Sequence, residues 1–254
     1  WSHVITPDGY KAWTTGESIQ KMSAVDYATW NAAPKVIVNT YFALVRSQPS
    51  ANAMVVSDVV WGDVMRYLGI NGKYIKVLLP DGRKGYVLRQ STLSFNKWVS
   101  RGKPKVNSII STAKKFIGFP YLWGGTSIKG MDCSGFTKTC FYLNGVILPR
   151  DASQQALTGE NIDITKDFND LQPADLLFFG SIRENKQHVS HVGIYIGKGE
   201  FIHSSGTVHI SSLVPGSINF DSMNTNRLLR AQRILTRIDL DSSIVSVKKH
   251  SYYQ

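Results

Sequence analysis

The chain has 254 residues and carries 29 Lys and Arg against 18 Asp and Glu, a formal net charge of +11 at pH 7. Hydrophobic residues make up 43% and charged residues 19%, which is the composition of a folded globular chain and excludes a disordered one. No apolar run reaches the roughly 18 residues that a membrane-spanning helix needs, so we expect no integral membrane segment. The positive charge suits a polyanionic partner, but the sequence lacks a dense basic block with interleaved aromatic residues, and we expect no nucleic-acid partner.

The first feature along the chain is an internal repeat. Trp1–Lys21 and Tyr74–Ser94 match in part at an offset of 73 residues, with a Pro-Asp-Gly sequence in each copy. Short alternating runs on both sides of this sequence predict a hairpin in each copy. Residues 34–72 precede the second copy, whereas the first copy starts at residue 1. We therefore expect an incomplete first domain and missing upstream sequence.

Residues 34–98 alternate short β-rich runs with turn sequences, which predicts a small barrel. Phe42–Ser47 and Asp81–Val87 resemble a strand and a hairpin of the bacterial SH3-like domains that are attached to cell-wall enzymes. We therefore divide this half of the chain into a partial first SH3-like copy with its connector, an SH3-like domain and a basic linker, at residues 1–33, 34–98 and 99–106.

Helical patterns begin at residue 107. Asn107 or Ser108 can cap a first helix that ends near Gly118, and Ser134–Leu143 has the spacing of a second. Four later segments read as strands: Asp175–Phe179, His191–Ile196, Glu200–Ser204 and a last one at residues 228–235. Helices followed by an antiparallel sheet predict an α+β domain over residues 107–237. Residues 238–254 show no clear pattern and are treated as a C-terminal tail.

Cys133 stands at the start of the second predicted helix and is one of two cysteines in the chain. Free backbone N–H groups and the helix dipole favour a thiolate there, so the position can lower the pKa of a thiol. The alternative is a buried structural cysteine. Cys140 lies too far along the same helix for an unstrained disulfide, so we expect both thiols to be reduced.

His191 and His203 are the candidate partners of this thiol. A three-residue loop at residues 196–198 would place them directly opposite each other, on the face away from the aliphatic core; a loop of two or four residues would separate them. His191 would act as base and acid, and His203 would orient it by accepting its Nδ1 proton. A metal site of Cys133, His188, His191 and His203 is the competing interpretation, but the spacing is wrong for zinc motifs. We predict no metal and no cofactor.

At this point the sequence resembles the NlpC family of bacterial cell-wall cysteine peptidases. Four segments follow the family's motifs in order: Tyr121–Phe136 (YLWGGTSIKGMDCSGF), Leu148–Gln155, Leu171–Phe179 and His191–His203. The resemblance implies a papain-like α+β catalytic domain, with helices packed on an antiparallel sheet, preceded by small all-β SH3-like barrels. Ala174 stands where the family usually has glycine.

The resemblance also implies an activity: hydrolysis of the γ-D-glutamyl to L-diamino acid amide bond in peptidoglycan stem peptides. The implied catalytic residues are Cys133, His191 and His203. Substrate-binding roles are implied for Tyr121 at the oxyanion and for Asp132 and Ser134 on the D-glutamyl side. Ala152 interrupts the family's Arg-Asp-Ser segment, which leaves Asp151 and Ser153 as alternatives for a further pocket residue.

Two SH3-like copies before the peptidase are similar to the recycling branch of the family, which trims free stem peptides with an unblocked N-terminal L-Ala. Tyr10, Trp13 and Glu17 lie in the partial first copy and are candidates for recognition of that amine. Three alternatives stay open: a hydrolase of intact wall anchored by its SH3-like part, a non-catalytic wall-binding protein, and an acyltransferase. We expect a monomer that is exported to the periplasm or cell envelope, with the cytoplasm as the alternative.

Overall fold

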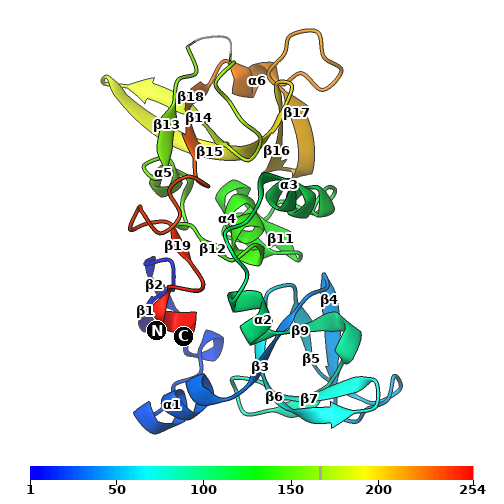
Figure 1. Cartoon of the computed structure of the whole chain (residues 1–254). Coiled ribbons are helices and arrows are strands. Elements are labelled where there is room, and N and C mark those ends of the chain that lie inside the picture. Colours follow the sequence, from blue (N-terminus) through cyan, green and yellow to red (C-terminus); the bar gives the residue numbers. More distant parts are fainter. Residues whose placement is uncertain (166–167, 254) are drawn as a thin grey trace. The chain divides into compact units, whose positions relative to one another are not determined.

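The computed structural model describes residues 1–165 and 168–253 and divides into two compact units (Figure 1). Unit 1 contains residues 1–6, 11–101 and the chain from residue 250, and unit 2 contains residues 7–10 and 102–249. The helices are α1 (Ala24–Ala32), α2 (Phe95–Val99), α3 (Val106–Lys115), α4 (Cys133–Leu143), α5 (Ala152–Gln155) and α6 (Ser222–Thr225), with short 3-10 turns η1 (Gly16–Ser18), η2 (Arg89–Ser91) and η3 (Ser251–Tyr253). In the part of the chain that the structure describes, no helix is long and apolar enough to cross a membrane.

The predicted repeat is confirmed as a repeat of local structure. The first copy runs β1 (Ser2–Ile5), β2 (Lys11–Thr14), η1, and the second runs β7 (Tyr74–Leu78), β8 (Lys84–Leu88), η2. Both hairpins turn at the glycine of Pro-Asp-Gly, where φ is 79° at Gly9 and 87° at Gly82. Glycine adopts this left-handed conformation without a Cβ clash, which explains why it stands in both turns.

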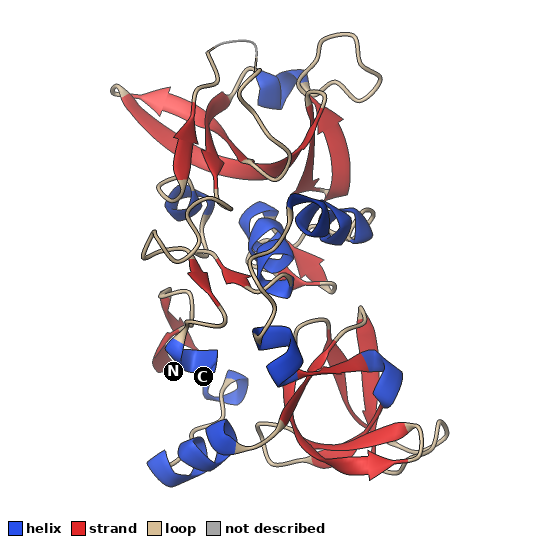
Figure 2. Ribbon diagram, viewed as in Figure 1, coloured by secondary structure: helices blue, strands red, loops and turns tan. Residues whose placement is uncertain are grey.

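The rest of unit 1 is a curled seven-stranded antiparallel sheet in the order β5-β4-β8-β7-β6-β3-β9 (Figure 2). The remaining bounds are β3 (Lys35–Val38), β4 (Phe42–Arg46), β5 (Val55–Val60), β6 (Val64–Asn71) and β9 (Thr92–Ser94). Inward-facing valines from several strands fill its core. Among them are Val45, Val77 and Val87, each 0% exposed. This architecture is consistent with the expected SH3-like domain. Residues 1–33, all of them described, form a hairpin, η1 and α1 instead of a second barrel.

Unit 2 is built on a six-stranded antiparallel sheet in the order β13-β18-β14-β15-β16-β17. The strands are β13 (Glu160–Ile162), β14 (Leu176–Arg183), β15 (Lys186–Gly197), β16 (Glu200–Ser205), β17 (Thr207–Ser212) and β18 (Leu228–Arg233). Helices α3, α4 and α5 pack against β15, so the predicted α+β class is confirmed (Figure 2). The two edge strands, β13 and β17, were not among the strands predicted from the sequence.

Both faces of this sheet are buried. On one face Tyr195 and Phe201 belong to an apolar cluster that the segment around Leu171 covers. Val192 and Ile194 point to the opposite face and are also 0% exposed. A sheet buried on both sides loses the simple alternation of apolar and polar residues.

Three local expectations are corrected. The N-cap of α3 is Lys105, and Ser108 donates from inside the helix to the Lys105 carbonyl at 2.7 Å instead of capping it. The predicted linker begins within α2, which Ser94 caps. The predicted tail belongs to unit 2 up to Lys249, where β19 (Val245–Ser246) pairs with β12 (Val146–Ile147), and the chain from residue 250 belongs to unit 1. Two-residue strands such as these, and β10 (Thr126–Ser127) with β11 (Gly130–Met131), are too short to show a period.

Candidate active site

Cys133 is the first residue of α4, as the sequence predicted. The preceding residue, Asp132, is the N-cap, and its carboxylate accepts from the Gly135 N–H at 2.7 Å and from the Gly124 N–H at 2.9 Å. A Cβ on Gly135 would lie 2.1 Å from the carbonyl oxygen of Gly125. The glycine-rich approach is therefore needed because it passes directly against the start of the helix.

The environment of Cys133 favours the neutral thiol. Its side chain is in the buried class, with 8% exposed, and burial raises the pKa of the thiol although the Val192 N–H partly offsets this effect. The expectation that the helix start lowers this pKa is therefore wrong, because desolvation outweighs the N–H groups and the dipole. Cys140 is also a free buried thiol, and burial raises its pKa well above the usual value.

The predicted register of the two histidine strands is also wrong. His203 lies opposite Gly193, not opposite His191. The turn has two residues, Lys198 and Gly199, between the paired residues Gly197 and Glu200.

The two histidines nevertheless share one face of the sheet. A β-bulge between Tyr195 and Gly197 leaves Ile196 without a partner in the ladder. This extra residue compensates for the two-residue turn and restores the side-chain parity. His191 is two residues from Gly193, so it lies diagonally across from His203 on the same face.

The two imidazoles are hydrogen-bonded. Nε2 of His191 lies 2.8 Å from Nδ1 of His203, and the ring centroids are 5.0 Å apart. We expected His191 to use Nδ1 for this bond, so the two nitrogens are exchanged. The arrangement leaves Nδ1 of His191 as the nitrogen outside this bond.

This face of the sheet is not exposed, in contrast to the expectation from alternation. His203 is 1% exposed and its ring lies 4.7 Å from that of Phe201, while the ring of His191 lies 5.7 Å from that of Phe179. Burial lowers the pKa of His191 to about 4, with a further contribution from the charge of Arg227. Burial, followed by repulsion from the neighbouring histidines, also lowers the pKa of His203. Both rings are therefore neutral at pH 7.

Two residues of β17 extend the histidine pair. His209 lies opposite His203, with ring centroids 4.4 Å apart. Ser211 places its hydroxyl 2.9 Å from Nε2 of His203. Neither residue was a candidate from the sequence, because β17 was not among the predicted strands.

A second polar cluster lies beside the helix start. Arg150 donates to Asp132 at 2.6 and 3.1 Å and to the Ser134 hydroxyl at 3.0 Å. Burial alone would raise the pKa of Asp132, but the bonds from Arg150 and Gly135 outweigh it and the pKa is lowered. Arg150 was missed as a site residue although it belongs to the quoted Leu148–Gln155 motif, which was the signal available.

The other residues expected to bind substrate are Tyr121, Asp151 and Ser153. Tyr121 is 37% exposed; burial raises the pKa of its phenol, and the nearby charges of Cys133 and Asp132 add to the effect. Asp151 is the N-cap of α5, and its own N–H donates to the Gln154 side chain at 3.1 Å. Ser153 is exposed on α5.

Residues 7–10 group with unit 2 and contribute to the same region. The Asp8 carboxylate, whose side chain is 1% exposed, pairs with Lys138 of α4. Asp132 raises the pKa of Arg150 against the effect of burial, and Asp151 and Tyr10 add smaller contributions. Of the three residues considered for amine recognition, Tyr10 is therefore the one that unit 2 includes.

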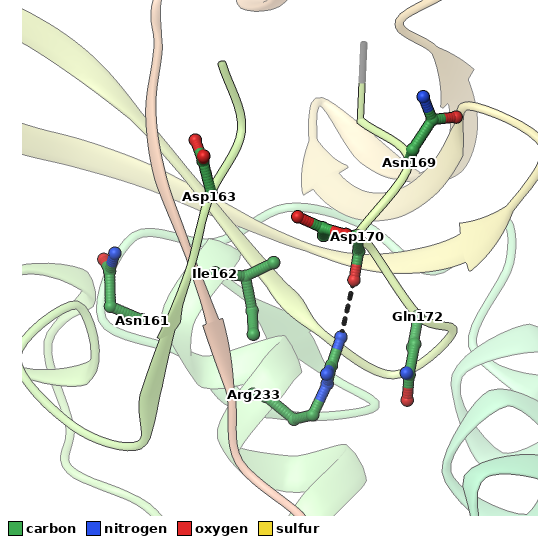
Figure 3. Close-up of a pocket in the computed structure, with 7 residues that line it drawn as sticks. All are labelled: Asn161, Ile162, Asp163, Asn169, Asp170, Gln172 and Arg233. Atoms are coloured by element: carbon green, nitrogen blue, oxygen red, sulfur yellow. Dashed lines mark hydrogen bonds between the residues drawn. The ribbon is translucent and has the colours of Figure 1, made fainter. Parts of the chain in front are cut away.

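In residues 1–165 and 168–253, no group of three or more His, Cys, Asp or Glu side chains is placed so that it could hold a metal ion. A polar pocket of about 340 Å³ beside β13 and β18 contains none of the predicted catalytic residues (Figure 3). Its lining includes Arg233, which donates to the Asp170 carbonyl and pairs with Asp175 at 2.8 Å. The thiol and histidine cluster thus remains the candidate active site.

Comparison with known proteins points to the same region. The profile of the NlpC/P60 family matches residues 118–227. A γ-D-glutamyl-L-lysine dipeptidyl-peptidase of Bacillus cereus is 30% identical over 208 residues, which are 82% of this chain and 60% of the relative. The protein of that name from Bacillus subtilis is 44% identical over 109 residues, 43% of this chain and 35% of the relative. The chain therefore spans less than two thirds of the length of either.

A solved structure extends the similarity over most of the chain. The crystal structure of an NlpC/P60 family protein from Bacillus cereus superposes with a TM-score of 0.71 at 31% identity. The match covers 89% of this chain and 70% of that protein. It therefore includes residues outside the segment that the family profile matches.

Proposed function

Because the chain belongs to the NlpC/P60 family, we propose that it is a cysteine peptidase that hydrolyses the γ-D-glutamyl to L-diamino acid amide bond of peptidoglycan stem peptides. The observation that carries the proposal is the hydrogen-bonded pair of His191 and His203 on the sheet against which the Cys133 helix packs. The names of the two Bacillus relatives support the bond that is cleaved.

In the proposed reaction the thiol of Cys133 attacks the γ-carbonyl carbon while Nδ1 of His191 takes the thiol proton. The imidazolium then gives this proton to the leaving amine, and the C–N bond breaks to leave a thioester. Water, deprotonated by the same nitrogen, attacks the thioester and releases the γ-D-glutamyl product. Backbone N–H groups at the start of α4 and the Tyr121 hydroxyl would stabilise the oxyanion.

Arg150 would define the D-glutamyl end of the substrate. Asp132 holds the guanidinium from one side, and Ser134 shares its Nη1. Asp132 thus acts mainly by positioning Arg150, which offers a planar, charged donor set for the substrate's free α-carboxylate. Asp151 and Ser153 on the adjoining turn remain candidates for the same subsite.

We further propose that the preferred substrate is a free fragment with an unblocked L-Ala amine. The support is local: Asp151 and Tyr10 both lie near enough to Arg150 to influence its pKa. A carboxylate and a phenol beside the D-glutamyl subsite would suit an ammonium group. Stem peptides belong to the cell envelope, so the proposal includes export of the protein.

Mass spectrometry of product release tests the activity. The full chain is incubated with L-Ala-γ-D-Glu-L-Lys, with its N-acetylated form, and with purified cell-wall sacculi, and Cys133→Ala is the control. We expect release of lysine from the free peptide only. Activity on sacculi at a similar rate would favour the wall-hydrolase alternative, and cleavage of none of the three would remove the enzyme proposal. Equal cleavage of free and acetylated peptide would reject the amine requirement.

A further inference from the structure

The histidine pair of the candidate site continues through a third hydrogen bond to a buried serine. Nε2 of His203 lies 2.9 Å from the Ser211 hydroxyl, and Ser211 is 5% exposed. Three polar groups from β15, β16 and β17 are thus joined in one row: His191, His203 and Ser211. The proton positions along this row decide which nitrogen of His191 is a base.

Two arrangements of protons are compatible with both hydrogen bonds of the row formed by His191, His203 and Ser211. In the first, His191 donates from Nε2 to Nδ1 of His203, and His203 donates from Nε2 to the serine oxygen. In the second, the serine donates to His203, which donates from Nδ1 to His191. A neutral imidazole carries one N–H, so the second arrangement puts the proton of His191 on Nδ1. That nitrogen could then not accept the thiol proton.

The first arrangement is also the only one that persists through the reaction. When His191 becomes an imidazolium it must donate from Nε2, so Nδ1 of His203 must accept. His203 then keeps its proton on Nε2, and this N–H needs an acceptor because a buried N–H without one loses its hydrogen bond to water and gains none in return. Within the described hydrogen bonds of His203, the Ser211 oxygen is the group that fills this place.

We propose that Ser211 is a positioning residue: by accepting the Nε2–H of His203 it holds both histidines in the tautomers that leave Nδ1 of His191 free as the base. The assignment rests on the proposed cysteine chemistry of this site. In this role Ser211 acts through His203, to which its hydroxyl is hydrogen-bonded. His209 does not compete for this role, because its Nδ1 donates to the Thr207 carbonyl at 2.9 Å.

Ser212 supplies a matched control. It is the next residue of β17, it is 1% exposed, and it points to the other face of the sheet. Its hydroxyl donates to Ser217 at 3.2 Å and accepts from the Val214 N–H at 3.0 Å. Ser212→Ala therefore removes an equally buried hydroxyl with its hydrogen bonds but leaves the histidine row intact.

The experiment uses the full chain labelled with 15N-histidine, and NMR identifies the protonated nitrogen of His203. A second measurement is the rate at which iodoacetamide alkylates Cys133, which needs the base but no peptide substrate. We expect the wild type and Ser212→Ala to carry the His203 proton on Nε2. Ser211→Ala should move it toward Nδ1 and slow both alkylation and turnover about 10- to 100-fold, while KM stays unchanged. Ser211→Thr, which keeps an acceptor, should restore the tautomer and most of the rate.

A His203 proton on Nδ1 in the wild type would overturn the inference, and this result needs no variant to fold. Wild-type alkylation in Ser211→Ala, or an equal loss in Ser212→Ala, would reduce Ser211 to a packing residue. If the wild type cleaves no stem peptide but shows the expected tautomer and alkylation rates, the proposed substrate is wrong and the role of Ser211 stands.

Discussion

Replacing Asp132 by alanine should destabilise unit 2 by about 4 kcal/mol. The side chain caps α4, and loss of an N-cap costs about 1 kcal/mol. It also neutralises Arg150, whose side chain is 15% exposed, and removal of one partner from a buried ion pair costs about 3–5 kcal/mol because the other charge stays buried. The two costs share the same carboxylate and are not strictly additive.

The measurement must report on unit 2 alone, because a chain with two units need not unfold in one step. Hydrogen exchange of peptides from α4, followed by mass spectrometry at increasing urea concentrations, gives the opening free energy of that unit. The double variant Asp132→Ala/Arg150→Met should recover about half of the loss, since no unpaired charge remains. Glu160→Gln is the control: Glu160 is 4.0 Å from Arg237 in an exposed pair, and its loss should cost less than about 1 kcal/mol.

The sign of the pH dependence follows from the lowered pKa of Asp132. The contribution of the ionised carboxylate is fully present above its unfolded pKa of about 3.9 and is lost as the pH falls through the lower folded value. The acid destabilisation of α4 should therefore be weaker in Asp132→Ala than in the wild type. A cost below about 1.5 kcal/mol at pH 7, or a double variant no more stable than the single one, would refute the reasoning.

Three further changes have defined outcomes. Ala174 has a φ of 76°, so Ala174→Gly should relieve strain and stabilise unit 2 by about 1 kcal/mol in the same exchange experiment, and a loss of stability would contradict this. A Cβ on Gly193 would lie 3.2 Å from Cβ of His203 and 2.8 Å from the Phe201 ring. Gly193→Ala should therefore displace His203 and lower kcat about 10- to 100-fold. An unchanged kcat would contradict the need for this exact position of His203. The pKa of His191 is lowered to about 4, so the single-turnover rate should be level from pH 5 to pH 8 and fall as the base is protonated near pH 4; a midpoint near 6.5 would contradict its burial.

The start of α4 could be predicted because its signals are local. The apolar spacing of Ser134–Leu143, the glycines before it and a capping side chain all lie within one short segment. Each of these signals reflects the conformational preference of the residues that carry it, and all three favour a helix that starts here. The hairpin turns at Gly9 and Gly82 were predictable for the same reason, since Pro-Asp-Gly specifies the turn without help from the rest of the fold.

The histidine register could not be predicted, although the shared face was anticipated. In a regular ladder, loop length alone sets which side chains share a face. The bulge at Ile196 adds one residue to one strand, and nothing in the local sequence requires it. The two-residue turn and the bulge have opposite effects on side-chain parity. The predicted shared face was therefore correct although the predicted register was not.

Arg150 illustrates a different limit. Its partner Asp132 lies 18 residues earlier, and the two meet because Gln155 ties the α5 segment to α4. Gln155 is 0% exposed and bonds to the Thr137 hydroxyl at 2.8 Å and the Ser134 carbonyl at 3.2 Å. Such a contact depends on how two elements dock. Sequence pattern identified both motifs but could not join them.

A neutral histidine at position 203, proposed to orient His191, fits the deep burial of that position. Burial raises the pKa of Cys133 and lowers that of His191, so both shifts favour a neutral pair at rest. A carboxylate at position 203, 1% exposed, would be a buried charge with no cation beside it until the imidazolium forms, at a cost of several kcal/mol. Neutral His203 carries no such cost. Its pKa is lowered further than that of His191, so in the proposed reaction the proton taken from the thiol would stay on His191, where the leaving amine could receive it.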